Sequence, residues 1–205
     1  MSLISISLPS FFSATAFEIF NYQLSVLELL ATLTSLVGVS LGVLGARITW
    51  PWWVSGSVLY GLLFLQWELY ASAILQIVFV LAGIWGWIGW GPQGAKPAKL
   101  TTRQRLVWTS LMVLGWAIFT PLFSSIGAAA TTLDTFILVG SLIAQILMVL
   151  EKYEAWILWF AVDIVGTFHY FQQDLVFTSV LYAVLTLVAV IGFRRWFREY
   201  YASNR

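Results

Sequence analysis

The chain has 205 residues, of which 60% are hydrophobic and 9% are charged, and its mean hydropathy is +0.90. This composition excludes a soluble globular protein and indicates a polytopic membrane protein. The absence of cysteine excludes disulfides and thiolate metal sites, and the net charge of +1 gives no indication of a nucleic-acid partner.

The N-terminal residues 1–22 hold Pro9 and Glu18 but no clean apolar run, so we expect an external arm or an interfacial helix there. Seven apolar segments follow, each near the ~20 residues that a helix needs to cross the hydrocarbon layer. They span residues 24–46, 50–67, 69–90, 104–125, 133–150, 155–172 and 174–196. The connection 91–103 is rich in Gly, Pro and Lys and predicts a flexible loop, and residues 197–205 form a tail. The sequence thus predicts an all-α protein with seven transmembrane helices.

All ten Lys and Arg residues lie in connections on the same side as the C-terminus when the segments are numbered one to seven. They are Arg47, Lys96, Lys99, Arg103, Arg105, Lys152, Arg194, Arg195, Arg198 and Arg205. Because the other side has only acidic residues, the positive-inside rule predicts a cytoplasmic C-terminus and tail and an external N-terminus. Six or eight spans would scatter the basic residues over both sides, which supports a count of seven.

An internal repeat relates positions 106 residues apart without a gap. It matches Trp50 to Trp156 and Trp53 to Trp159. The same offset matches Glu28 to Asp134, Ser35 to Ser141, Gln66 to Gln172, Glu68 to Asp174, Gly86 to Gly192 and Trp90 to Trp196. An apolar background produces Leu–Leu matches by chance, but Trp, Gln and acidic matches in one register indicate a true repeat.

Each repeat holds three helices, in residues 23–90 and 131–196, and residues 91–130 form a cytoplasmic loop and a linker helix. Three crossings would invert the second repeat, so the linker helix restores its direction. The result is two parallel three-helix repeats joined by a linker helix, a 3+1+3 plan. Parallel repeats are a known transporter plan with the substrate near the midplane at the repeat interface, so the architecture predicts a transporter.

The candidate substrate site begins with Trp156, Trp159 and Asp163, which lie at i, i+3 and i+7 on one helix face. Asp163 is the sole formal charge between Ala155 and Phe171. A carboxylate that deep in a membrane segment is expensive, so it should face the bundle interior or an aqueous cavity. Aromatic faces beside a buried anion fit a flat, positively charged organic molecule. The alternative is that Asp163 hydrogen-bonds its neighbours and only locks two helices.

The repeat extends this face into the first half of the chain. Ser57 is the repeat mate of Asp163, so the predicted pocket is charged on one side and neutral on the other. The candidate substrate-binding residues on the two faces are Trp53, Ser57, Tyr60, Trp156, Trp159, Asp163 and Tyr170. For Trp156, which begins a helix on the basic side, an interfacial aromatic belt is the alternative.

Other polar side chains lie inside apolar segments. Asp134, Ser141 and Gln145 form one stripe at i, i+7 and i+11. Gln145 and Gln76 are either interhelical hydrogen-bonding residues, worth ~0.6–2 kcal/mol, or substrate contacts. Glu28 and Asp134 begin their helices on the outer side, where a carboxylate complements the helix dipole. We interpret both as helix caps or as outer-gate residues.

The sequence offers no set of residues for a metal, a cofactor or catalysis. His169 is the sole histidine, about 120° around the helix from Asp163, and no second His or acid stands at metal-ligand spacing. No phosphate-binding loop with Lys-Ser/Thr occurs, so direct use of ATP is not indicated. Without a nucleophile–base pair, we expect a protein that is not an enzyme.

The segments Trp50-Pro-Trp-Trp53, Leu69-Tyr-Ala-Ser72, Gly86-Trp87 and Trp156-Ile-Leu-Trp159, in a 3+1+3 arrangement, resemble the Pnu family of bacterial vitamin transporters, relatives of the SWEET sugar transporters. The resemblance spans residues 24–196. Because Gly56 and Asp163 stand where nicotinamide riboside carriers have Asn, the chain looks most like the thiamine branch. The resemblance implies thiamine uptake, or alternatively nicotinamide riboside uptake.

The resemblance also implies how such a carrier works and where it resides. We expect facilitated diffusion by alternating access in a bacterial inner membrane, with substrate trapped through phosphorylation by a cytosolic kinase. A proton site at Asp163 would make the carrier a symporter, and this alternative stays open. A homo-oligomer such as a trimer is expected from the same resemblance.

Overall fold

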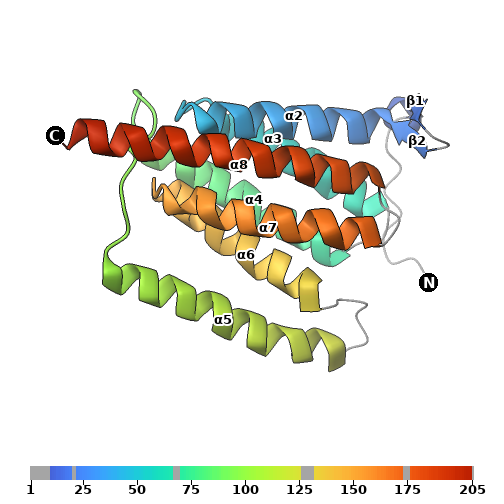
Figure 1. Ribbon diagram of the computed structural model, residues 1–205. Coiled ribbons are helices and arrows are strands. Elements are labelled where there is room, and N and C mark those ends of the chain that lie inside the picture. The colour runs from blue at the N-terminus through green and yellow to red at the C-terminus, as the bar shows by residue number, and fades with distance from the viewer. Residues whose placement is uncertain (1–9, 20–21, 67–69, 126–131, 173–175, 205) are drawn as a thin grey trace. The chain divides into compact units, whose positions relative to one another are not determined.

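The computed structural model describes residues 10–19, 22–66, 70–125, 132–172 and 176–204 (Figure 1). In these ranges the chain forms seven helices of 18 to 28 residues, preceded by a short helix and a two-stranded hairpin. Glu68 and Asp174, one matched pair of the repeat, lie outside the described residues. The chain divides into two compact units, residues 1–42 with 46–94 (unit 1) and residues 43–45 with 95–205 (unit 2).

Unit 1 contains α1 (Ser10–Ser13), β1 (Thr15–Ile19), β2 (Tyr22–Ser25), α2 (Val26–Val43), α3 (Thr49–Gln66) and α4 (Tyr70–Gly89). Helix α3 packs against α4. It also approaches α2 closely, because a Cβ atom added at Gly56 would lie 2.5 Å from the Ser35 hydroxyl oxygen. A Cβ atom at Gly38 would lie 3.2 Å from the Trp53 amide nitrogen. Small residues thus let the two backbones meet.

The antiparallel hairpin takes the place of the interfacial helix that was one alternative for residues 1–22. Glu18 pairs with Gln23 across the two strands. Helix α2 begins directly after β2, and the Ser25 hydroxyl accepts a hydrogen bond from the Glu28 amide at 3.1 Å, which caps the helix. Strands of five and four residues contain too few alternations to be predicted from hydrophobic periodicity.

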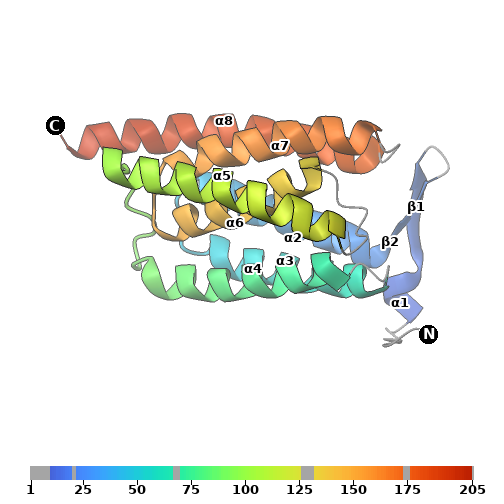
Figure 2. The ribbon, with the colours of Figure 1, turned by 90° about the horizontal axis from the view of Figure 1, so that it is seen from below.

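Unit 2 contains α5 (Thr102–Ser125), α6 (Thr132–Val149), α7 (Glu154–Gln172) and α8 (Val176–Ser203). Neighbours along the chain pack together, α5 with α6, α6 with α7 and α7 with α8. Figures 1 and 2 show these four helices running lengthwise beside one another. Helix α5, the predicted linker, has no buried side chain and contacts α6 where Trp116 lies edge-on to Phe136. An apolar helix exposed along its length requires lipid as its solvent.

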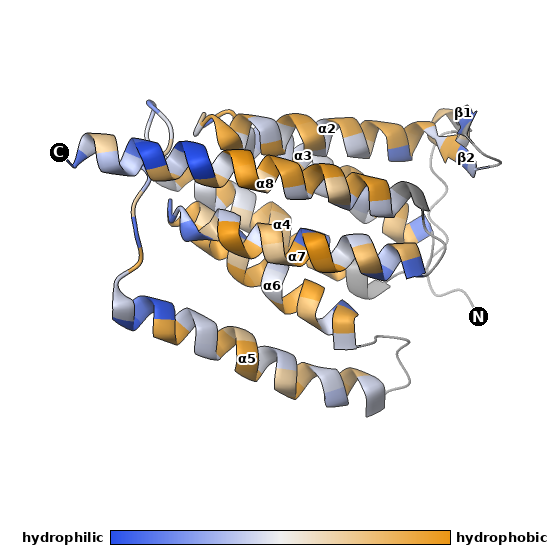
Figure 3. Ribbon diagram, in the orientation of Figure 1, coloured by the Kyte–Doolittle hydropathy of each residue, from blue (hydrophilic) through white to orange (hydrophobic). Residues whose placement is uncertain are grey.

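Four helices in the described residues are long and apolar enough to cross a membrane: α2, α5, α6 and the part of α8 from Thr178 to Ser203. The stretch Ala73–Gly89 of α4 is shorter but also apolar. Figure 3 shows hydrophobic residues along these helices and hydrophilic ones at the start of α5 and the last turns of α8. Helices α3 and α7 are less apolar because Trp, Ser, Gly and, in α7, Asp and His interrupt them. These two repeat mates carry most of the predicted site residues.

Helices α2 and α6 end in the same way, at positions that the repeat matches. After α2, Gly45 has a φ angle of 69°, and the Ala46 amide donates to the carbonyl five residues earlier at 3.1 Å. After α6, Glu151 has a φ angle of 59°, and the Lys152 amide donates to the carbonyl five residues earlier at 2.9 Å. Both ends are Schellman caps with a left-handed residue. The sequence repeat therefore has a counterpart in the backbone.

A second shared feature is a contact between tryptophan and glycine. In unit 1, Trp50 of α3 lies over Gly86 of α4, where an added Cβ atom would be 2.2 Å from the indole ring. In unit 2, Trp156 of α7 lies over Gly192 of α8, with a corresponding distance of 2.5 Å. Each indole also meets a second tryptophan edge to face, Trp90 in unit 1 and Trp196 in unit 2. These contacts join α3 to α4 and α7 to α8 in the same manner.

The connection 91–103, predicted to be flexible, is anchored over part of its length. The Ala98 amide donates a hydrogen bond to the Glu151 carbonyl at 2.8 Å, and the Tyr153 amide donates to the Ala98 carbonyl at 3.1 Å. This parallel bridge holds the loop against the turn between α6 and α7. The prediction was wrong here because composition does not show which distant backbone groups a loop will meet.

Basic residues of unit 2 gather where α5 begins, α6 ends and α8 ends. Arg105 forms an ion pair with Glu154 at 2.9 Å, which ties the first turn of α5 to the first turn of α7. The Lys99 ammonium lies 5.7 Å from the Tyr200 ring of α8. Basic residues at one end of the helices are what the positive-inside argument requires, and the orientation of the termini stays a prediction.

Candidate functional site

Two contacts fix how α6 and α7 lie against each other. A Cβ atom added at Gly140 of α6 would be 2.5 Å from the Val162 side chain of α7. The Asp134 carboxylate at the start of α6 contacts the imidazole Nε2 atom of His169 near the end of α7. The two helices are therefore antiparallel, and these contacts define their register.

This register places buried polar residues of α6 and α7 at neighbouring levels. Ser141 is level with Asp163, and Gln145 lies about one turn away, level with Trp159. The Ser141, Asp163 and Gln145 side chains have 6%, 4% and 1% of their surface exposed. The structure therefore brings together within unit 2 the polar stripe of one predicted helix and the carboxylate of the next.

The Asp163 carboxylate is buried, and the described residues offer it no compensating partner. Thr167 donates its hydroxyl to the Asp163 backbone carbonyl at 2.8 Å, whereas no group in the described ranges donates to the carboxylate itself. These contacts give no support to the alternative in which Asp163 locks two helices through hydrogen bonds. An uncompensated buried charge costs several kcal/mol, so this group requires a cation or a proton.

Gln145 is the second polar group without a partner. Among the residues that the structure describes, neither the amide nitrogen nor the amide oxygen of its side chain has a hydrogen-bond partner. A buried amide left in this condition costs about 1–3 kcal/mol. An interhelical hydrogen bond would have supplied that partner, so the arrangement favours a ligand contact for Gln145.

Aromatic side chains lie on both sides of this polar level along α7. Trp159 lies about one turn from Asp163, toward the start of α7. In the other direction Tyr182 of α8 packs onto Gly166, where an added Cβ atom would be 2.3 Å from the ring. Tyr182 also contacts Tyr170, with ring centroids 5.0 Å apart. Flat aromatic faces beside a buried carboxylate and an amide suit a flat cation.

The matching face of unit 1 carries hydroxyl groups in place of the charge. Ser57, the repeat mate of Asp163, is 4% exposed. Tyr60 of α3 shares a hydrogen bond with Thr32 of α2 at 3.0 Å. Polar groups are thus buried on α2 and α3 in unit 1 and on α6 and α7 in unit 2, but the carboxylate belongs to unit 2.

Two further predicted residues are Trp53 on α3 and Gln76 on α4. The Trp53 ring is 6.1 Å from the Trp50 ring, centroid to centroid. A Cβ atom added at Gly61 would be 3.5 Å from the Gln76 Cβ atom, so Gln76 faces α3 from α4. Their contact with substrate stays a prediction.

Glu28 and Asp134, the predicted gate residues, are each held within their own unit. The Tyr22 hydroxyl lies 2.8 and 2.9 Å from the two Glu28 carboxylate oxygens, and burial together with this hydrogen bond raises the pKa of Tyr22. Asp134 is paired with the buried His169. Both acids lie in the first turn of their helices, where they complement the helix dipole. These contacts favour the capping role, and gating stays a prediction.

Trp156, also expected to bind substrate, belongs to the packing between α7 and α8. Its indole is 1% exposed and covers Gly192. A ring so buried is not part of an interfacial belt, which requires contact with the headgroup region. We therefore interpret Trp156 as a packing residue and leave it out of the site.

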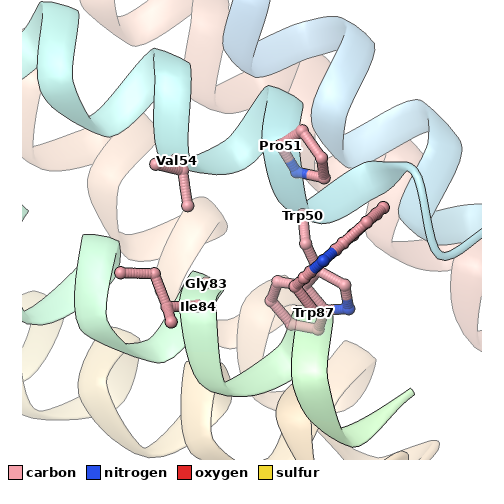
Figure 4. A pocket seen from close by; sticks show the side chains of 6 residues that line it. All are labelled: Trp50, Pro51, Val54, Gly83, Ile84 and Trp87. Carbon is pink, nitrogen blue, oxygen red and sulfur yellow. The ribbon is translucent and has the colours of Figure 1, made fainter. Parts of the chain in front are cut away.

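A surface hollow of about 180 Å³ lies between α3 and α4 (Figure 4). Its lining residues are Trp50, Pro51, Val54, Gly83, Ile84 and Trp87. Ligand pockets usually measure about 300–1,000 Å³ and include a few polar groups. This hollow is small and apolar, and none of its lining residues was predicted to bind substrate.

Sequence reasoning missed two parts of this region. It found no partner for His169, because the spacing along one helix cannot reveal that Asp134 on another helix meets it. It also passed over Tyr182, whose position follows from the space above Gly166. In the described residues no group of three metal-ligating side chains gathers around His169 or elsewhere.

Apolar helices of membrane length, with a buried carboxylate and a buried amide that have no partner among the described residues, indicate the class of multi-pass membrane transporters. The sequence profile described as nicotinamide mononucleotide transporter matches residues 25–198, and the chain belongs to this family.

Relatives with known names agree with this membership. The chain is 27% identical over 207 residues to the nicotinamide riboside transporter PnuC of Escherichia coli (strain K12), across 86% of this chain and 87% of the relative. It is 26% identical over 195 residues to the riboflavin/roseoflavin transporter RibM of Streptomyces davaonensis, across 90% of each. A crystal structure of the vitamin B3 transporter PnuC matches with a TM-score of 0.71 and 24% identity over 86% of this chain and 82% of that one, which shows a shared fold.

These relatives confirm the Pnu family and do not support the thiamine branch. Their names refer to nicotinamide riboside and riboflavin. The assignment to the thiamine branch from Gly56 and Asp163 was therefore too specific, because two residues in a pocket do not determine which of several flat vitamins is carried.

Proposed function

We propose that this protein is a vitamin transporter that carries nicotinamide riboside across the membrane. The observation that carries this proposal is the buried Asp163 carboxylate on α7, which has no donor among the described residues. Nicotinamide riboside has a positively charged pyridinium ring, whereas the ring system of riboflavin is neutral. Of the vitamins named for the relatives, the cationic one matches the carboxylate.

The other groups of the site suit the rest of this substrate. The pyridinium ring stacks on the aromatic faces of Trp159 and Tyr182, where cation–π attraction contributes about 0.5–2 kcal/mol. The Gln145 amide, which lacks a partner among the described residues, pairs with the carboxamide of the nicotinamide through one donor and one acceptor. Trp159, Asp163 and Gln145 thus recognise the ring, its charge and its substituent.

The membrane arrangement is part of the proposal. We place seven spans in the bilayer as two parallel three-helix repeats joined by α5, with the C-terminus in the cytoplasm. The matched caps after α2 and α6 and the basic residues at one end of unit 2 support it. Transport then proceeds by alternating access, with substrate trapped by a cytosolic kinase. The homo-oligomer stays a prediction.

Calorimetric titration of the detergent-purified protein tests the substrate. We expect nicotinamide riboside to bind most tightly, thiamine more weakly because its cationic ring carries no carboxamide, and riboflavin most weakly because it is neutral. A Glu154→Gln variant, which changes an acid of the same helix about 13 Å from Asp163, serves as the matched control and should keep this order. Tighter binding of riboflavin than of nicotinamide riboside would contradict the proposal.

A further inference from the structure

We infer that the carrier exchanges its cationic substrate for a proton on Asp163, so that each cation entering the cell is balanced by one proton leaving it. The inference rests on the proposed function, because it takes Asp163 as the group that receives the cation. It changes the expected mode of transport from plain facilitated diffusion to electroneutral exchange.

Within the described part of unit 2, no fixed cation lies beside Asp163 to neutralise it. The residues nearest in level on α6, Ser141 and Gln145, are neutral. On the helices packed around the site, the titratable groups nearest to Asp163 along the helices are Asp134 on α6, His169 and Tyr170 on α7, and Tyr182 on α8. The other charged or titratable residues of these helices lie toward the start of α7, where Trp156 covers Gly192 of α8. They are Glu154 on α7 and Arg194, Arg195, Arg198, Glu199, Tyr200 and Tyr201 on α8. His169 contacts Asp134 and lies about 9 Å along α7 from Asp163, so these two groups are engaged with each other.

Arg105, a cation beside the start of α7, is paired with an acid and is distant from Asp163. Arg105 is paired with Glu154, which lies nine residues and about 13 Å along the helix from Asp163. Within the described part of unit 2, the carboxyl group is therefore left to a mobile cation. When no substrate is bound, that mobile cation is a proton. A buried carboxyl group without partners takes up a proton rather than remain ionised.

The site then has two neutral states. When it is empty, Asp163 is a protonated carboxyl group, and when it is occupied, a carboxylate pairs with the pyridinium ring. As the cation binds, the O–H bond of Asp163 breaks and its proton passes to water on the side from which the cation came. After the cation leaves on the other side, a proton from that side re-forms the O–H bond. The protonated empty carrier completes the cycle.

Two consequences separate this exchange from simple diffusion of a cation. Because the loaded and empty carriers are both neutral at this site, the membrane potential does not drive uptake. A pH difference does, since the ratio of internal to external substrate comes to equal the ratio of internal to external protons. In a carrier whose Asp163 stays ionised, the membrane potential drives uptake and a pH difference does not.

Sealed liposomes without a kinase test these consequences with labelled nicotinamide riboside. With the potential held at zero and the interior one pH unit more acidic, we expect about tenfold accumulation. An inside-negative potential at equal pH should produce none. Accumulation that follows the potential and ignores the pH difference would overturn the inference.

Variants locate the exchanging group. Asp163→Asn cannot take up a proton, so its residual uptake should lose the response to pH and follow the potential. Glu154→Gln removes an acid from the same helix at a distance from the site and should keep the pH response. Loss of that response in Asp134→Asn, together with its persistence in Asp163→Asn, would place the proton elsewhere and overturn the inference.

A binding measurement on the wild-type protein decides the question even if Asp163→Asn fails to fold. Calorimetry in two buffers of different ionisation enthalpy should show one proton released for each nicotinamide riboside bound. Binding without proton release would overturn the exchange and leave the proposed function intact. Absence of vitamin binding would overturn both.

Discussion

Replacing Gly86 by alanine should destabilise this protein, whereas the same replacement at Gly89 in the same helix should not. A Cβ atom at position 86 would be 2.2 Å from the Trp50 indole, while one at position 89 would have no atom within 4 Å. The Trp50 ring has no room to retreat, because it is 0% exposed and lies 4.8 Å from the Trp90 ring, centroid to centroid.

The comparison isolates the steric strain. Alanine gains helix propensity of about 1 kcal/mol at position 86 in the helix interior and less at position 89, the last residue of α4, so a lower Tm of Gly86→Ala cannot come from propensity. Overpacking of a filled core costs about 1–3 kcal/mol. For a protein of this size each kcal/mol corresponds to about 2–4 °C, so Gly86→Ala should melt roughly 2–12 °C below Gly89→Ala.

Thermal unfolding of the detergent-purified variants, followed by circular dichroism, provides the assay. Gly192→Ala should repeat the loss in unit 2, where the added Cβ atom would meet Trp156 at 2.5 Å. Affinity for nicotinamide riboside in the folded fraction should not change, because these contacts lie outside the site. An apparent Tm for Gly86→Ala equal to or above that of Gly89→Ala would refute the packing role of the two tryptophans.

Other changes test the site and the topology. Asp163→Asn should raise the Kd for nicotinamide riboside about ten- to hundredfold, since hydrogen bonds to charged groups contribute about 1.5–3 kcal/mol; unchanged affinity in calorimetry would remove Asp163 from the site. In the same titration Trp159→Phe should be milder than Trp159→Ala by about 0.5–2 kcal/mol, and equal losses would argue against stacking. Glu154→Gln breaks the ion pair with Arg105, whose side chain is 51% exposed, so the apparent Tm should fall by no more than about 4 °C. A reporter fused after Arg205 should be active only in its cytoplasmic form, and periplasmic activity would reverse the orientation.

The long helices could be predicted because lipid imposes a simple requirement on sequence. A run of apolar residues long enough to cross the membrane has few alternatives to a helix. The segment predicted at 155–172 accordingly became α7, Glu154–Gln172, and the one at 104–125 became α5, Thr102–Ser125. The hairpin before α2 lies outside any apolar run, and no such requirement revealed it.

The site was predicted in part, for a similar reason. Polar groups inside apolar helices are costly, so Asp163 and Gln145 were visible in the sequence. The surroundings of these two residues could not be predicted, because they depend on contacts between helices. Examples are the pairing of His169 with Asp134 and, within the described ranges, the absence of donors to the Asp163 carboxylate. The burial of Trp156 over Gly192 was also not visible, because one indole can bind a ligand, line an interface or cover a glycine, and periodicity does not separate these roles.

Counterflow in proteoliposomes tests most directly that this chain carries a cationic vitamin. Liposomes containing the purified protein are loaded with unlabelled nicotinamide riboside and diluted into a trace of the labelled vitamin. We predict transient uptake of label above that of protein-free liposomes, competed by external nicotinamide riboside and by thiamine but not by riboflavin. Uptake no greater than in protein-free liposomes, or competition by riboflavin alone, would contradict the account.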